Sequence, residues 1–224
     1  MPDGSAYASP RRLDHNQLDP FVARLIAVAA GHAGTFVVFG GGEAPGTYAA
    51  LRRQIHAVEN GVGALQGLLD AFDRINAVPG LNAYISIGLF KPRDQWRNPN
   101  GRGSEADLIG TMAFVGDFDV GRGHDGAVSI GQLPMAPHYV VETSAGSFQP
   151  WIFLDRPYSV AEAKPVFAAL TRALGGDATF SCEHIFRPPG TWNWPTGKKV
   201  RDYGRSPEPQ LARLISPMME PPVW

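Results

Sequence analysis

Two aspartates separated by one residue close an apolar stretch near the middle of the chain. Asp117 and Asp119 flank Phe118. In an extended strand, residues two apart project from the same face, so both carboxylates are expected side by side. Such a pair repels itself unless a cation lies between the groups, and hard oxygen ligands suit Mg²⁺ or Mn²⁺. The spacing therefore predicts a divalent-metal site, although an isolated Asp-x-Asp is also typical of an acidic strand end beside a turn.

Three further segments follow the acidic pair in a fixed order. They are residues 142–149 (ETSAGSFQ), residues 175–177 (GGD) and residues 187–193 (RPPGTWN). Upstream, residues 91–93 (KPR) and 101–107 (GRGSEAD) lead into the pair. Together, across roughly residues 82–205, these motifs resemble the archaeo-eukaryotic primase superfamily, especially its plasmid and phage replication primases. Each motif alone is weak, and their combination is specific.

The resemblance implies that Asp177 completes an acidic cluster with Asp117 and Asp119. Nucleotidyl transfer needs one ion to activate a 3′-hydroxyl and another to hold the triphosphate, so two Mg²⁺ or Mn²⁺ ions are the implied cofactors. From the residues alone, an N-cap or turn position after the two glycines is the favoured interpretation of Asp177. Glu183 is the competing candidate for the third carboxylate.

The segment at residues 142–149 is implied to contact the nucleotide through Ser144, Ser147 and Gln149. Gln149 stands where many members of the superfamily have His. A glutamine amide can donate to a phosphate or sugar oxygen but cannot act as an acid or base near neutral pH. We therefore expect Gln149 to bind rather than to transfer protons.

The segment at residues 187–193 supplies the implied phosphate ligand. Arg187 precedes two prolines, which stiffen the backbone beneath a guanidinium whose planar fork matches phosphate oxygens. Asn193 matches the family motif directly, whereas the usual lysine is displaced, because residues 194–197 intervene before Lys198. The residues expected to contact nucleotide are thus Arg187, Asn193 and Lys198, and those expected to contact DNA are Lys199, Arg201 and Trp194.

The resulting hypothesis is a DNA-templated nucleotidyltransferase, a primase or DNA polymerase. Its expected partners are a single-stranded DNA template, a primer strand, nucleoside triphosphates (NTP or dNTP) and, by analogy, a replicative helicase. The alternative is a non-catalytic module that binds single-stranded nucleic acid and keeps the primase fold. A replication-initiating nicking enzyme is disfavoured, because the six histidines are scattered without metal-ligand spacing.

Composition sets the frame for these hypotheses. The chain has 224 residues, 44% of them hydrophobic, and a formal net charge of −1. Any polyanion site must therefore be local, and residues 187–205 carry five basic side chains against one acidic side chain. The single cysteine, Cys182, excludes an internal disulfide, and no run of residues suits a signal peptide or membrane span. A cytoplasmic protein is expected.

Hydrophobic periodicity predicts the elements that position these residues. Helices are expected over residues 19–30 and 159–174, the second with a Ser159-x-x-Glu162 capping box, and helical spacing extends over residues 47–75. Strands are expected at 35–39, 82–89, 111–120, 139–142 and 149–154. The glycine-rich residues 40–47 lack the Gly-Lys-Ser/Thr ending of a phosphate loop and are expected to form a turn.

These elements predict an α+β fold with an RRM-like antiparallel sheet and helices on one face. Residues 1–15 are expected to be a flexible arm, residues 16–81 a helical part with one strand, and residues 82–224 the catalytic core of one compact domain.

Overall fold

The computed structural model describes residues 11–119, 133, 135–174 and 181–215. The helices are α1 (His15–Val28), α2 (Ala64–Asn76), α4 (Val160–Leu174) and α5 (Gly197–Tyr203), with 3₁₀ turns η2 (Arg93–Gln95) and η3 (Glu105–Asp107). The strands are β1 (Thr35–Gly42), β2 (Gln54–Glu59), β3 (Leu81–Ser86), β4 (Gly88–Phe90), β5 (Leu108–Val115), β6 (Tyr139–Ser144), β7 (Ser147–Tyr158), β8 (Ile185–Phe186), β9 (Trp192–Asn193), β10 (Gln210–Leu211) and β11 (Arg213–Leu214). In this part of the chain, no helix has the length and apolarity to cross a membrane.

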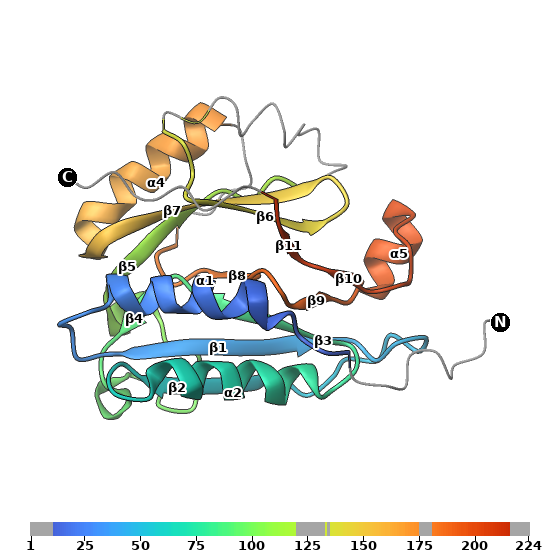
Figure 1. Cartoon of the computed structure of the whole chain (residues 1–224), viewed down its shortest axis with the longest axis horizontal. Helices are drawn as coiled ribbons and strands as arrows, with labels where there is room; N and C mark the ends of the chain where they lie inside the picture. Colours follow the sequence, from blue (N-terminus) through green and yellow to red (C-terminus); the bar gives the residue numbers. More distant parts are fainter. Residues whose placement is uncertain (1–10, 120–132, 134, 175–180, 216–224) are drawn as a thin grey trace.

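Nine of the described strands form one antiparallel sheet, and β9 and β10 pair in a separate two-stranded sheet. The path of the larger sheet is β11-β6-β7-β5-β4-β1-β3-β8, with β2 paired to β1, and each of these pairings is antiparallel. Figure 1 shows the strands in two groups, with β5, β6 and β7 above and β1, β2 and β3 below. The predicted α+β class with an antiparallel sheet is confirmed. The predicted boundary at residue 82 stays a prediction, although β1 and β3 on either side of it are hydrogen-bonded neighbours.

The helices cover both faces of this sheet. On β7, Trp151 and Phe153 contact Phe21 of α1, with ring centroids 4.8 and 5.7 Å apart. On β5, Phe114 packs against Phe167 of α4 at 4.7 Å. Phe114 pairs with residue 152 and therefore projects from the face opposite to residues 151 and 153. The expectation of helices on one face is wrong, because the strands are apolar on both faces and each face needs a cover.

Residues 47–75 depart from the helical pattern expected for them. Gln54–Glu59 form strand β2, which pairs with β1 from Thr35↔Glu59 to Gly40↔Gln54. Only the later part is helical, as α2, which buries Leu68, Phe72 and other apolar side chains against the lower strands. The half-buried residues of this edge strand alternate weakly, so periodicity alone does not separate the strand from a helix.

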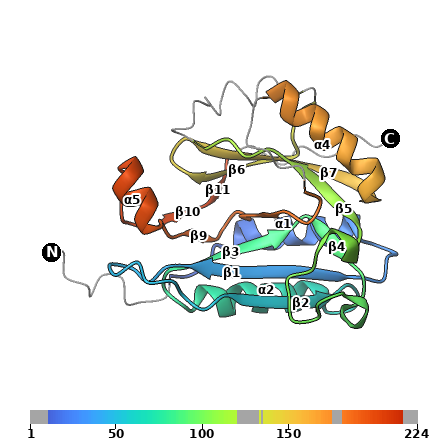
Figure 2. The same ribbon diagram turned by 180° about the vertical axis from the view of Figure 1, so that it is seen from behind.

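The segment that contains β8 and β9 runs between the two strand groups in both ribbon views (Figures 1 and 2). Its backbone is held at Gly190, whose N–H donates to the Ala212 carbonyl at 2.8 Å and whose carbonyl accepts from the Asp14 N–H at 2.9 Å. Gly190 has φ +79°, and a Cβ there would lie 2.3 Å from the Asp14 carbonyl oxygen. Glycine is therefore required at this turn.

Of two predictions about the ends of elements, the one for the start of α4 is confirmed and the one for the end of β5 is wrong. The capping box of α4 is confirmed, since the Glu162 carboxylate accepts from both the N–H and the hydroxyl of Ser159 at 2.8 Å. The strand expected over residues 111–120 instead ends at Val115, and Phe118 forms an isolated bridge with Phe148.

Candidate active site

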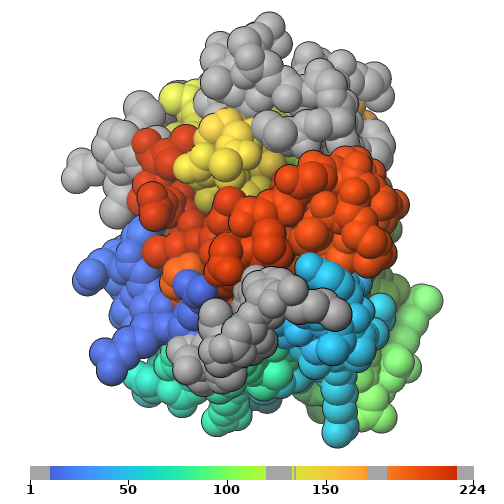
Figure 3. Space-filling view, turned by 90° about the vertical axis from the view of Figure 1, so that its right-hand side faces the viewer, coloured from blue at the N-terminus to red at the C-terminus, as the bar shows by residue number. Residues whose placement is uncertain are grey.

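A cavity of about 250 Å³ lies where the two strand groups meet the crossing segment. Figure 3 shows residues of the crossing segment and α5, in orange to red, across the middle of this face, between the yellow strands above and cyan residues below. Seven of the predicted site residues line the cavity: Asp117, Asp119, Gln149, Arg187, Asn193, Trp194 and Lys199. The cavity thus gathers residues from three of the sequence motifs.

The acidic pair is positioned by the residue between its members. Phe118 is 1% exposed, and it exchanges backbone hydrogen bonds with Phe148 of β7 at 3.0 and 3.1 Å. Burial of this aromatic ring leaves Asp117 and Asp119 to project from the opposite side of an extended backbone. Both therefore line the cavity, as the Asp-x-Asp spacing predicts, although they stand just beyond the strand rather than within it.

Gln149 connects the acidic pair to the basic segment. Its Nε2 donates to Asp117 Oδ1 at 3.2 Å, and its Oε1 accepts from the Arg187 backbone N–H at 3.3 Å. The amide is therefore oriented from both ends. In this arrangement Gln149 holds a carboxylate in place, a binding and orienting role that needs no proton transfer.

The Arg187 side chain is 4% exposed and is bonded on several sides. Its Nη1 donates to the Trp192 carbonyl at 2.9 Å, and its Nη2 donates to Asn82 Oδ1 at 2.9 Å and to the Tyr84 hydroxyl at 3.1 Å. The guanidinium also lies 4.7 Å above the Tyr84 ring. Burial lowers the pKa of Arg187 from its ordinary value, which Tyr84 partly opposes, and arginine still remains a cation.

Two more cations approach the acidic pair from α5 and the residues that follow it. Lys199 Nζ lies 3.6 Å from Asp119 Oδ2, and Arg205 Nη2 lies 3.7 Å from Asp119 Oδ1. Burial lowers the pKa of Lys199, whereas the nearby Asp119 carboxylate raises it. Arg205 also donates to the Ser147 hydroxyl at 3.1 Å. Asp119 is therefore neutralised by side chains that could equally attract a phosphate.

Other predicted site residues lie outside this cavity. Ser147 is fully buried beneath Arg205, and Ser144 lines two neighbouring cavities instead. Lys198 and Arg201 are exposed on α5, so Lys199 rather than Lys198 is the lysine that faces the acidic pair. Asp177 lies outside the described residues.

Several side chains that the sequence motifs do not mark also line the cavity, among them Asn82, Tyr84 and His184. Asn82 and Tyr84 occupy alternate positions of β3, so both side chains lie on one face of that strand. Arg187 is hydrogen-bonded to both of them on this face. A buried asparagine at the start of an apolar strand is the available sequence signal. His184 is tilted against Phe186, and burial lowers its pKa.

The donor set at the acidic pair suits a divalent cation. Asp117 and Asp119 offer carboxylate oxygens, which Mg²⁺ and Mn²⁺ prefer, on one wall of the cavity. Within the described ranges, no group of three or more His, Cys, Asp or Glu side chains could hold a metal ion. Glu183 does not line the cavity. Two carboxylates suffice where substrate phosphates and water complete the coordination, as is usual for Mg²⁺.

The fold is that of a primase-polymerase domain. The AEP domain of the cyanophage S-2L Primase-Polymerase (PrimPol) superposes with a TM-score of 0.57 and 19% identity, covering 92% of this chain and 91% of that chain. The crystal structure of primase RepB′ superposes with a TM-score of 0.52 and 15% identity, covering 88% of this chain and 56% of that chain. A search among curated proteins found no significant match.

The sequence adds a second, more particular similarity. Residues 123–214 match the family model described as the RepB DNA-primase N-terminal domain. This range contains the Gln149 and Arg187 segments and begins just after the acidic pair. The predicted resemblance to the archaeo-eukaryotic primase superfamily, and to its plasmid and phage replication primases, is confirmed.

Proposed function

We propose that this chain is a replication primase-polymerase that joins nucleoside triphosphates into a strand complementary to single-stranded DNA. The observation that carries the proposal is the meeting, in one cavity, of the carboxylates of Asp117 and Asp119 with the cations of Arg187 and Lys199. A nucleotidyltransferase needs this combination, because it must hold divalent ions and a polyphosphate together. The primase-polymerase fold and the RepB DNA-primase match support the same activity.

In the proposed reaction a 3′-hydroxyl oxygen attacks the α-phosphate of the incoming nucleotide. A phosphodiester bond forms, the bond between the α- and β-phosphates breaks, pyrophosphate leaves and the hydroxyl proton passes to solvent. Two Mg²⁺ or Mn²⁺ ions, when bound by Asp117 and Asp119, supply the charge that lowers the hydroxyl pKa and stabilises pyrophosphate.

The side chains of the chain have the following proposed roles. Arg187 and Lys199 bind the phosphates, and Gln149 keeps Asp117 oriented. Asp117 and Asp119 carry two negative charges, and Arg187, Lys199 and Arg205 beside them carry three positive charges, so most of the charge of a bound triphosphate must be balanced by the ions it brings. Asp177 is proposed as a third acidic ligand, and Asn193 and Ser144 as further nucleotide contacts. Lys198 is exposed on α5 and Ser147 is fully buried, so neither is assigned a nucleotide contact.

Primer synthesis and extension on single-stranded DNA tests the proposal. Labelled NTP or dNTP is supplied with Mg²⁺ or Mn²⁺, and wild type is compared with Asp117→Asn and Asp119→Asn. We expect a loss of product of at least a thousandfold in either variant, because each removes an anionic ligand. Asp155→Asn, an exposed aspartate of β7 outside the cavity, is the matched control and should keep full activity.

The competing function is a module that binds single-stranded nucleic acid without turnover. It is favoured if wild type makes no product while DNA binding persists unchanged in Asp117→Asn and without metal. Binding of Mn²⁺, followed by electron paramagnetic resonance, gives a second readout that does not depend on turnover. Wild type that binds no Mn²⁺ in the presence of nucleotide would refute the metal assignment. The helicase partner stays a prediction.

A further inference from the structure

Two more cavities continue the hollow away from the acidic pair. The middle one, of about 170 Å³, shares Asn193 with the active-site cavity. The outer one, of about 400 Å³, shares Ser144, Ala145 and Gln210 with the middle one. The three cavities thus follow one another past the turn between β6 and β7. We call the outer one the Trp192 pocket, after the indole that lines it.

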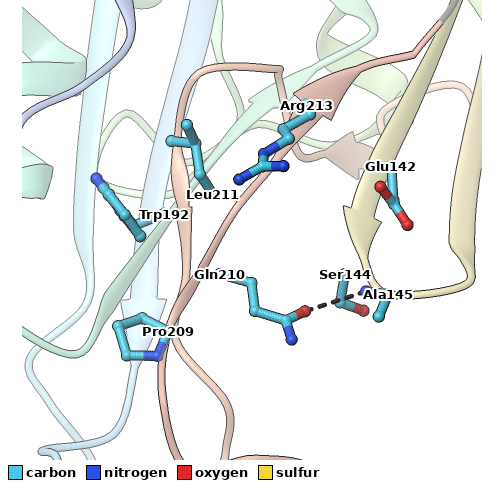
Figure 4. Close-up of a pocket in the computed structure, with 8 residues that line it drawn as sticks. All are labelled: Glu142, Ser144, Ala145, Trp192, Pro209, Gln210, Leu211 and Arg213. Atoms are coloured by element: carbon cyan, nitrogen blue, oxygen red, sulfur yellow. Dashed lines mark hydrogen bonds between the residues drawn. The ribbon is translucent and has the colours of Figure 1, made fainter.

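The Trp192 pocket is built from an aromatic ring and several polar side chains. Figure 4 shows Trp192, Leu211 and Gln210 on one side and Glu142 on the other, with the Arg213 guanidinium between them. The indole is fixed in place, because its Nε1 donates to the Arg12 carbonyl at 2.8 Å and the Arg11 guanidinium lies 4.8 Å from the ring centroid. A fixed, partly exposed indole is a stacking platform for a planar ligand.

The Gln210 amide is also oriented. Its Oε1 accepts from the Ala145 N–H at 3.0 Å, the dashed contact in Figure 4. The amide NH₂ is therefore the end of Gln210 that is directed away from Ala145. An oriented amide donor beside an aromatic ring suits the carbonyl and ring-nitrogen acceptors of a nucleobase.

The charge of the pocket excludes a triphosphate as the preferred occupant. Glu142 and Arg213 are paired residues of neighbouring strands β6 and β11, so one negative and one positive charge face each other. The active-site cavity differs, since Arg187 and Lys199 stand there beside proposed metal ligands. A neutral, planar group fits the Trp192 pocket better than a polyanion, and its volume lies within the range of about 300–1,000 Å³ usual for small-molecule sites.

We propose that the Trp192 pocket holds one unpaired base of the single-stranded DNA template, stacked on Trp192 and contacted by the Gln210 amide. The identification of the bound strand as a template rests on the proposed function. The identification of a base as the occupant rests on the pocket alone. The row of cavities gives the path: a strand whose paired nucleotide occupies the active-site cavity continues past Asn193 and Ala145 and places a later base on Trp192.

Abasic scanning tests the proposal without turnover. Binding of a fluorescein-labelled single-stranded DNA is followed by anisotropy in EDTA, with a series of oligonucleotides that each lack one base. We expect Trp192→Ala to weaken binding of intact DNA about tenfold, and Trp192→Phe to restore most of it. Removal of one particular base should weaken wild-type binding to the same extent, and Trp192→Ala should then add nothing.

Two further variants separate stacking from loss of folding. Gln210→Glu keeps an acceptor for the Ala145 N–H and removes the amide donor, so its loss should depend on which base occupies that one position. Leu65→Ala, at an exposed residue of α2, is the control and should bind all oligonucleotides like wild type. Thermal unfolding confirms that each variant is folded.

Several outcomes overturn the proposal. They are unchanged binding in Trp192→Ala, a loss that is the same at every abasic position, and a loss of nucleoside triphosphate affinity with DNA affinity intact. The last result would assign the pocket to a free nucleotide. A chain that makes product but shows no position-specific effect refutes this pocket alone. A chain that shows the effect but makes no product refutes the proposed synthesis and leaves a base-binding site.

Discussion

Replacement of Asn82 by alanine should destabilise the protein more than loss of any other polar contact at the site. Asn82 is 3% exposed. Its Oδ1 accepts from Arg187 Nη2 at 2.9 Å and from the Trp194 N–H at 2.7 Å, and its Nδ2 donates to the Trp194 carbonyl at 3.0 Å. The Asn82 side chain is therefore hydrogen-bonded to the buried Arg187 cation and to both backbone groups of Trp194.

The magnitude follows from these three bonds. Two neutral hydrogen bonds contribute about 1 kcal/mol each, and a bond to a charged donor about 1.5–3 kcal/mol. Tyr84 continues to accept from Arg187 in the variant, which places the charged bond at the low end of that range. We expect Asn82→Ala to lower the free energy of unfolding by about 3–4 kcal/mol, which corresponds to roughly 10 °C in Tm for a chain of this size.

Equilibrium unfolding in urea, followed by circular dichroism, measures this loss. The reference is Asn193→Ala, which removes a single bond to the Thr143 carbonyl at 2.6 Å from a half-buried side chain and should cost about 1 kcal/mol. If Asn82→Ala costs no more than Asn193→Ala, Asn82 does not organise the buried Arg187 segment and the reasoning fails.

Three further predictions concern charge and pH. Lys199→Gln should weaken nucleoside triphosphate binding at least tenfold, whereas Lys198→Gln on the exposed side of α5 should leave it within twofold, as measured by nucleotide-induced thermal shifts. Burial raises the pKa of Cys182 to about 11, so the reaction of this thiol with iodoacetamide at pH 8 should be at least a hundredfold slower in the folded protein than after unfolding. The buried neutral thiol stabilises the folded state below pH 9, and this stabilisation should be lost as pH rises from about 9 to 11. The pKa of Glu162 is lowered to about 2, chiefly by its hydrogen bond to Arg156. The Glu162 carboxylate should therefore stabilise the start of α4 above its ordinary pKa, and this stabilisation should be lost as pH falls towards 2. The amide chemical shift of Ser159, measured against pH, follows this loss.

The sequence allows prediction of those site residues whose roles depend on local pattern. The Asp-x-Asp spacing places Asp117 and Asp119 on one wall, and the stiff proline segment presents Arg187. Most strand positions follow from apolar runs in the same way. These features need no knowledge of what lies elsewhere in the chain, because alternation and backbone restriction act within a few residues.

The remaining features depend on partners far along the chain. Asn82 and Tyr84 become site residues only because Arg187, more than 100 residues later, is buried against them. The choice of Lys199 over Lys198 depends on the phase of a short helix. Thr196 begins α5 by accepting from the Lys199 N–H at 3.3 Å, and this start decides which lysine turns to the cavity. The presence of two adjacent lysines in the sequence does not by itself show which of them faces the cavity.

The long sequence separation inside the site has a consequence for synthesis on the ribosome. The bond from Arg187 to Asn82 spans 105 residues, and that from Trp192 to Arg12 spans 180. At about 5–20 residues per second, β3 waits roughly 5–20 s after its own translation before its polar side chains meet a guanidinium. During that interval the Asn82 and Tyr84 side chains of β3 lack the Arg187 guanidinium that they contact in the folded protein. Slower synonymous codons between residues 82 and 187 would lengthen this interval, and we expect them to lower the yield of correctly folded molecules.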